Sequence, residues 1–145
     1  MQNDFYATER RHNRRSLLIL AAIVFLISVL WLSIGKAQAT TFLNHPAGCP
    51  RVAFCGCGAA VEVGYGPRRD LWPSSAWPRK FPRTNPAPQT VAYRRGHVFV
   101  LKRHISGKTW LVADYNSGGH RSRLHPRSIA GYIIVDPRTH IAAGK

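Results

Sequence analysis

An uncharged apolar run from Ser16 to Ile34 is the feature that most constrains this chain of 145 residues. Four arginines stand just before it, and the small-x-small sequence Ala37-Gln38-Ala39 follows it. A basic start, an apolar middle and a small-x-small cleavage site are typical of a secretory signal. The run is also long enough to span a bilayer of roughly 30 Å, with the arginines inside. We therefore expect a cytoplasmic segment at 1–15, a signal peptide or transmembrane anchor at 16–39, and the remainder outside the cytoplasm.

Basic residues dominate the part of the chain after Ala39. It holds sixteen lysines and arginines against four acids, so its net charge is +12. A field of that sign attracts polyanions. Because this part is expected outside the cytoplasm, we predict peptidoglycan or another anionic envelope polymer as its partner. We expect the membrane to be contacted only through the N-terminal segment, and no nucleic acid to be bound.

Three cysteines, Cys49, Cys55 and Cys57, lie in the exported part. An odd number in an oxidising compartment suggests one disulfide and one free thiol. Cys55 and Cys57 both stand at the start of a short predicted helix, where unpaired backbone N–H groups favour a thiolate. Their spacing alone, however, favours a structural role for both. The C-x₅-C-x-C spacing is not one that zinc sites use, and we expect neither metal nor cofactor.

The order of predicted elements indicates an α+β domain of short helices packed on a small antiparallel sheet of about four or five strands. We expect a linker at 40–48, a globular domain at 49–137 and a flexible tail at 138–145. Short helical stretches are predicted at 54–63 and 70–77, before a proline-rich segment at 81–88. The predicted strands are 90–93, a central strand 97–103 with its hairpin partner 109–115, a short edge strand 121–124, and 130–135.

His97 opens the strand with the strongest apolar pattern. A histidine in that place can face a helix that packs on the same sheet. Asp114 and Asn116 share one face of the neighbouring strand at a period of two. Either side chain can accept a hydrogen bond from the imidazole and hold it in one tautomer. The sequence Asn116-Ser117-Gly118-Gly119 is equally typical of a plain turn.

Several short motifs follow one another in an order that suggests a family. They are Phe54-Cys55-Gly56, Asp70-Leu71-Trp72, Pro86-Ala87-Pro88, Gly96-His97-Val98, Asp114-Tyr115-Asn116-Ser117-Gly118-Gly119 and Gly131-Tyr132. Over roughly residues 49–137 this order resembles the CHAP branch of the NlpC-type papain-like cysteine hydrolases, including small exported rhizobial proteins.

The resemblance implies a papain-like fold in which Cys55 is the nucleophile, His97 the general base and Asn116 the residue that orients the base. Cys57 and Asp114 are the alternatives for the first and third roles. If Cys55 is the nucleophile, Cys49 and Cys57 remain as a pair that can be bridged. The implied substrate is a peptide or amide bond of peptidoglycan, cleaved in the periplasm or outside the cell, with or without an inner-membrane anchor.

A catalytically inactive basic module that docks to anionic cell-wall polymer is the alternative function. Phe99 occupies the position where the family usually has a glycine after His-Val, and a bulky ring there narrows the cleft or marks lost activity. In that case the fold and charge would serve binding, and the cysteines would serve only as cross-links.

Overall fold

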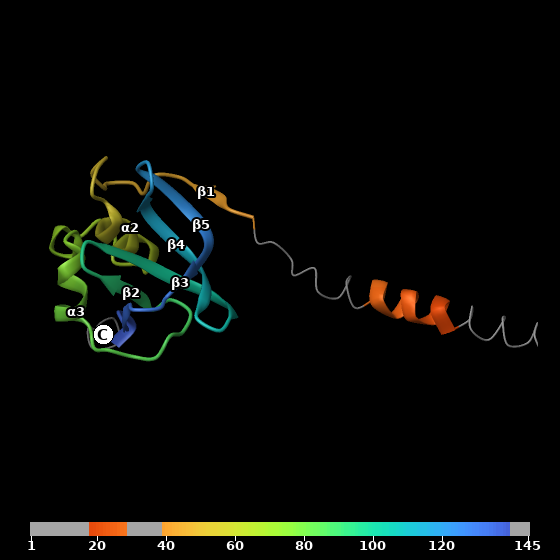
Figure 1. Ribbon diagram of the computed structural model, residues 1–145. Helices are drawn as coiled ribbons and strands as arrows, with labels where there is room; N and C mark the ends of the chain where they lie inside the picture. Colours follow the sequence, from red (N-terminus) through yellow and green to blue (C-terminus); the bar gives the residue numbers. More distant parts are fainter. Residues whose placement is uncertain (1–17, 29–38, 140–145) are drawn as a thin grey trace, which may run out of the picture. The chain divides into compact units, whose positions relative to one another are not determined.

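The computed structural model describes residues 18–28 and 39–139 and divides into two compact units, Met1–Ala37 and Gln38–Lys145. In the first unit, residues 18–28 are helical, as Figure 1 shows. Their large apolar side chains are exposed. Within the described ranges, no helix has both the length and the apolar composition that crossing a membrane requires. The basic segment 1–15 and most of the rest of the predicted export segment 16–39 lie outside the described residues.

The second unit is built on one six-stranded sheet whose neighbouring strands are all antiparallel. Its order is β1-β5-β4-β3-β2-β6. The strands are β1 (Thr41–Leu43), β2 (Val91–Arg94), β3 (His97–Ser106), β4 (Thr109–Ser117), β5 (Arg121–Ser128) and β6 (Ile133–Val135). The predicted α+β class with an antiparallel sheet is confirmed.

The longest strand, β3, lies in the middle of the sheet with both faces covered. Val98 and Val100 belong to a buried cluster that includes Ala59 and Ala60 of the helix α2 (Cys55–Glu62). Phe99 and the residues near it pack in a second buried cluster with Trp110 and Val112 of β4. Successive side chains of a strand point to opposite faces, so an unbroken apolar run requires cover on both. The prediction of a central strand is therefore confirmed.

The helix α2 packs against β3 and β4, as Figure 1 shows, and its glycines permit the close approach. Gly56 lies against the backbone of a short helix η1 (Arg69–Leu71), and Gly58 lies against the ring of Tyr115. Glycine is a poor helix former, yet here it is the residue that fits. Two further short helices, η2 (Ser74–Ala76) and α3 (Trp77–Lys80), complete the helical layer that the prolines interrupt.

Replacing Gly56 with alanine is expected to destabilise the second unit. A Cβ at this position would lie 2.1 Å from the Trp72 carbonyl oxygen and 2.4 Å from the Leu71 carbonyl oxygen. We expect the free energy of unfolding to fall by about 3 kcal/mol, measured by chemical denaturation. Gly118→Ala is the matched control, because its nearest neighbour would be a flexible Arg123 nitrogen at 3.6 Å. Equal losses in the two variants would contradict the prediction.

The sheet extends beyond the predicted four or five strands at one edge. The predicted linker 40–48 contains β1, which pairs with β5 from Thr41 opposite Leu124 to Leu43 opposite Ser122. Consequently β5 is not the edge strand that the sequence suggested, and it runs twice as far as the predicted 121–124. Pro46 and Gly48 are typical of a linker, but both follow β1 and leave its backbone free to pair.

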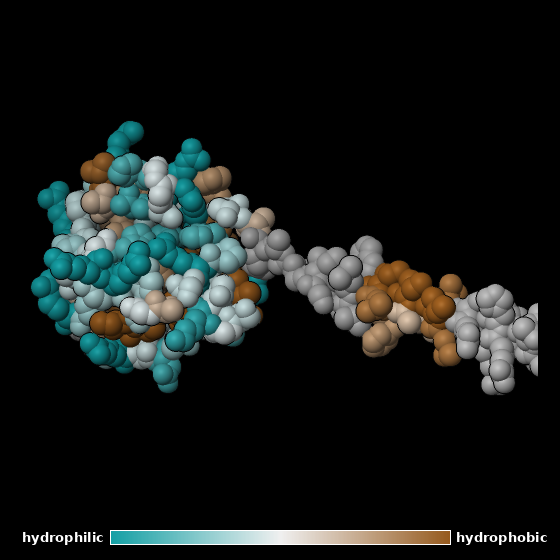
Figure 2. Space-filling model, in the orientation of Figure 1, coloured by the Kyte–Doolittle hydropathy of each residue, from teal (hydrophilic) through white to brown (hydrophobic). Residues whose placement is uncertain are grey.

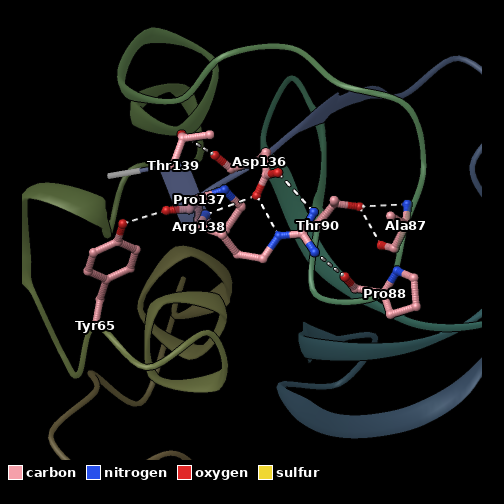
Figure 3. A network of polar contacts seen from close by, with 8 residues as sticks. All are labelled: Tyr65, Ala87, Pro88, Thr90, Asp136, Pro137, Arg138 and Thr139. Atoms are coloured by element: carbon pink, nitrogen blue, oxygen red, sulfur yellow. Dashed lines mark hydrogen bonds and ion pairs between the residues drawn. The ribbon is translucent and has the colours of Figure 1, made fainter. Parts of the chain in front are cut away.

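Hydrogen bonds hold residues 136–139 at the end of the domain. This segment includes the beginning of the predicted flexible tail. The Tyr65 hydroxyl donates to the Pro137 carbonyl at 2.6 Å, and the Arg138 Nε donates to an Asp136 oxygen at 2.8 Å. Arg138 also reaches the Pro88 carbonyl at 3.5 Å, as Figure 3 shows. The flexibility of the segment 138–145 stays a prediction: Arg138 and Thr139 make hydrogen bonds, and residues 140–145 lie outside the described chain.

Candidate active site

Cys55 is the first residue of α2, and its thiol is free. The N–H of Gly58 donates to the Phe54 carbonyl at 2.8 Å, which sets the start of the helix at Cys55. The first N–H groups of a helix have no partner within it, and they stabilise negative charge nearby. The side chain is only 5% exposed. The sulfur therefore occupies a buried place at the positive end of the helix.

The other two cysteines form a disulfide, Cys49–Cys57, across eight residues of sequence. The two helix cysteines that the sequence left as alternatives thus have different states: one is bridged and one is a thiol. Only Cys55 can ionise as the chain stands. The bridge ties the loop before α2 to the first turn of the helix, where Cys57 is fully buried.

His97, the first residue of β3, lies between Cys55 and Asp114. Its Nε2 is 2.7 Å from Asp114 Oδ1, and its imidazole interacts with the Cys55 sulfur by hydrogen bonding and charge. The histidine side chain is 16% exposed and the carboxylate is fully buried. A thiol, an imidazole and a carboxylate are thus aligned in the order that an activated nucleophile requires.

Both ionisable groups of the Cys55–His97 pair have shifted pKa values. Burial raises the pKa of Cys55, but the His97 imidazole, with the N–H groups of Val98 and Gly56, lowers it further than burial raises it. Burial lowers the pKa of His97, while the Asp114 carboxylate and the Cys55 sulfur raise it to about 9 overall. The two shifts favour a thiolate beside an imidazolium.

Asp114 accepts hydrogen bonds on both of its oxygens. Oδ1 faces His97, while Oδ2 contacts His125 Nε2 at 3.2 Å and the Arg127 Nη1. Burial raises the pKa of Asp114, but the His97 hydrogen bond and the charges of His97 and Arg127 lower it below its ordinary value. The carboxylate therefore stays charged although no solvent reaches it.

Asn116, which the resemblance placed behind the imidazole, lies elsewhere. Its backbone is in the left-handed region, with a φ of +58°, and the pairing of β4 with β5 shifts register between Asp114 and Ser117. Such a bulge breaks the period of two, on which the prediction that Asp114 and Asn116 share one face of the strand depended. Asn116 Oδ1 instead pairs with His120 Nδ1 at 2.9 Å. The structure brings together Cys55, His97 and the alternative third residue, Asp114.

Two residues around Asp114, His125 and Arg127, were not singled out from the sequence. They belong to the stretch 121–128, where basic side chains recur at every second position from Arg121 to Arg127. Alternate residues of a strand share a face, so this pattern was a usable signal. What the sequence did not supply was the register that sets this face beside β4.

Alkylation of Cys55 is expected to depend on pH through the thiolate. In the wild type, the rate with iodoacetamide should reach half its maximum below pH 9.0, the ordinary pKa of a thiol. In His97→Gln, burial still raises the pKa of Cys55, but no imidazole lowers it. We therefore expect the pH of half-maximal alkylation to rise by at least about one unit. Mass spectrometry of the modified peptide measures the rate.

His104→Gln is the control, since His104 is exposed and its ring contacts the Gly107 carbonyl. If the His97 variant has the wild-type pH profile, His97 does not lower the pKa of Cys55 and the assignment of this pair is contradicted.

Within residues 18–28 and 39–139, no cluster of three or more His, Cys, Asp or Glu side chains is placed to hold a metal ion. Comparisons of the chain with known protein families, with curated proteins and with solved structures find no match. The resemblance to CHAP hydrolases therefore stays a prediction. Function has to be inferred from the arrangement of the side chains.

Proposed function

We propose that the second unit is a cysteine hydrolase of the CHAP/NlpC type that cleaves peptide or amide bonds of peptidoglycan. The observation that carries this proposal is the alignment of the free Cys55 thiol, the His97 imidazole and the buried Asp114 carboxylate. Each member has the environment that its role needs: a helix start for the thiolate, two partners for the imidazole, and full burial with cationic neighbours for the carboxylate.

The reaction would proceed by acyl transfer through the sulfur. The Cys55 thiolate attacks the carbonyl carbon, and the oxygen that gains the electron pair is stabilised by N–H groups at the start of α2. The His97 imidazolium gives its proton to the leaving amine as the C–N bond breaks, which leaves a thioester on Cys55. The imidazole then takes a proton from water, whose oxygen attacks the thioester. The carboxylic acid product departs, and the thiolate and the imidazolium are restored.

An acidic substrate suits the charge around the site. Hydrophilic residues cover much of the visible face of this unit in Figure 2, and basic residues outnumber acids four to one after Ala39. A hollow of about 390 Å³ is lined by Arg68, Arg79 and Lys80 over an apolar floor that includes Leu71. The Leu71 carbonyl packs on Gly56, the residue after Cys55. Asp70 forms ion pairs with Arg68 and Lys80, which leaves an excess of positive charge at the hollow. Peptidoglycan stem peptides carry free carboxylates, which such a charge attracts.

An exported location follows from the same proposal. The disulfide Cys49–Cys57 is of a kind that persists in oxidising compartments. It supports placement in the periplasm or outside the cell, with the export segment either removed or kept as an inner-membrane anchor. Peptidoglycan is reachable from either position.

A binding module without catalytic activity is the second candidate. The observation that favours it is the burial of the nucleophile, because only 5% of Cys55 is exposed. If no substrate carbonyl reaches that sulfur, the positively charged surface still docks to anionic wall polymer. Such binding would weaken as salt rises.

Purified sacculi incubated with the mature wild-type protein distinguish the two functions. The hydrolase should release soluble fragments with new amino groups and no new reducing sugar ends, and prior treatment with iodoacetamide should stop the release. A binding module would sediment with the sacculi and release nothing. If protein that has not been treated with iodoacetamide sediments with the sacculi and releases no new amino groups, the hydrolase proposal is wrong.

A further inference from the structure

Arg127 of β5 makes three contacts that fix its guanidinium behind Asp114. Its Nη1 donates to Asp114 Oδ2, and its Nη2 donates to the Tyr132 hydroxyl at 3.2 Å. The centre of the guanidinium also lies 4.8 Å from the centre of the Phe99 ring. A planar guanidinium can make all three contacts at once, whereas an ammonium cannot. The arginine is therefore held in a single orientation toward the carboxylate.

The charges of the site alternate along a chain of four side chains. With Cys55 as a thiolate and His97 as an imidazolium, the order Cys55, His97, Asp114, Arg127 is negative, positive, negative, positive. These charges sum to zero. An uncompensated charge in a buried place is costly, and removing one partner of a buried pair exposes that cost. Without Arg127, this cluster would carry one excess negative charge in a part of the domain where Asp114 is fully buried.

We propose that Arg127 is a positioning residue of the catalytic site, which holds the Asp114 carboxylate so that Oδ1 faces His97. This inference rests on the proposed hydrolase and extends it from three residues to four. Arg127 touches neither sulfur nor substrate; it acts through Asp114. Because it holds Oδ2, the carboxylate cannot turn that oxygen toward the imidazole, and the His97 ring keeps one partner.

Other charged groups face this chain and are part of its electrostatics. His97 approaches Asp114 from β3, and His125 approaches it from β5. Beyond Arg127 lies the Tyr132 ring, with the Arg94 guanidinium 5.2 Å from its centre. Arg94 is exposed, so solvent screens it, while Arg127 contacts the buried carboxylate directly. The removal of Arg127 should therefore change the site far more than the removal of an outer cation.

The test compares three variants of the full mature domain. In Arg127→Gln the cation is lost, so we expect the His97 titration, followed by NMR of the ring protons, to move up by about one pH unit. Arg127→Lys keeps the positive charge but loses the planar guanidinium with its two donor nitrogens. We then expect the titration near its wild-type value, while sacculus hydrolysis falls by about tenfold. Lys108→Gln removes a charge from the exposed turn between β3 and β4 and should change neither quantity.

A double-mutant cycle shows whether Arg127 acts through Asp114. If it does, Arg127→Gln in an Asp114→Asn background should lower the rate of sacculus hydrolysis no further. Additive effects of the two substitutions on this rate would overturn the proposal. So would an Arg127→Gln titration that superimposes on the wild type or moves to lower pH, because a residue that only packs on Phe99 has no reason to shift it upward. The cycle remains informative if Arg127→Gln alone folds poorly, since Arg127→Lys keeps the charge.

The titration needs no substrate, which separates this inference from the proposed function. If sacculi are not cleaved but the His97 titration shifts as expected, the hydrolase proposal fails and the electrostatic role of Arg127 holds. If sacculi are cleaved and the titration does not respond to Arg127→Gln, the role of Arg127 fails alone.

Discussion

Exchange of Cys55 for serine should abolish the hydrolysis of sacculi, with a loss of at least about 10³-fold in rate. A hydroxyl is far less acidic than a thiol, so His97 cannot hold it as an anion. The fold should survive, because the two side chains are similar in size and Cys55 makes no disulfide. Release of amino groups from sacculi measures the rate, and circular dichroism measures the fold.

The matched control removes the other two cysteines together. Cys49→Ser/Cys57→Ser opens the bridge and leaves Cys55 as the only thiol. We expect this variant to lose about 2–3 kcal/mol of stability, because the short loop gains freedom in the unfolded chain. At a temperature where it is still folded it should cleave sacculi. If it is inactive while Cys55→Ser is active, the assignment of the nucleophile is wrong.

Exchange of Asp114 for asparagine should reduce hydrolysis by about 10³–10⁴-fold. The neutral amide does not stabilise the imidazolium, and it leaves the Arg127 cation without its counter-ion. It also removes a contribution to stability. In the wild type, the pKa of His97 rises from 6.5 to about 9, so this contribution is complete below pH 6.5 and is lost as pH rises through 9. Denaturation at pH 6 and pH 10 should show that difference in the wild type and a smaller one in Asp114→Asn.

Asn116→Ala is the control for Asp114, because the two positions were rival candidates for the same role. Asn116 pairs with His120 at an exposed bulge, so we expect its loss to change hydrolysis by less than about threefold. A severe loss in Asn116→Ala, with little change in Asp114→Asn, would contradict the geometry of the site.

The sequence by itself determined the class of the domain and the elements that bear chemistry. The apolar run from His97 to Leu101 predicts a strand covered on both faces, and β3 lies in the middle of the sheet. The glycines and cysteines after Phe54 predict a short helix that begins near a thiol, and α2 begins at Cys55. These are local patterns of residue type, and local patterns decide helix, strand and turn.

Only the tertiary structure decided which of the candidate residues meet. The choice between Cys55 and Cys57 depended on which cysteine lies close enough to Cys49 to bond it. The choice between Asp114 and Asn116 depended on a bulge that ends the alternation of faces in β4. Arg127 became visible only when the pairing of β4 with β5 set it beside Asp114. Such choices rest on distances between residues far apart along the chain, and a spacing in sequence carries the period of a strand but not its register against a neighbour.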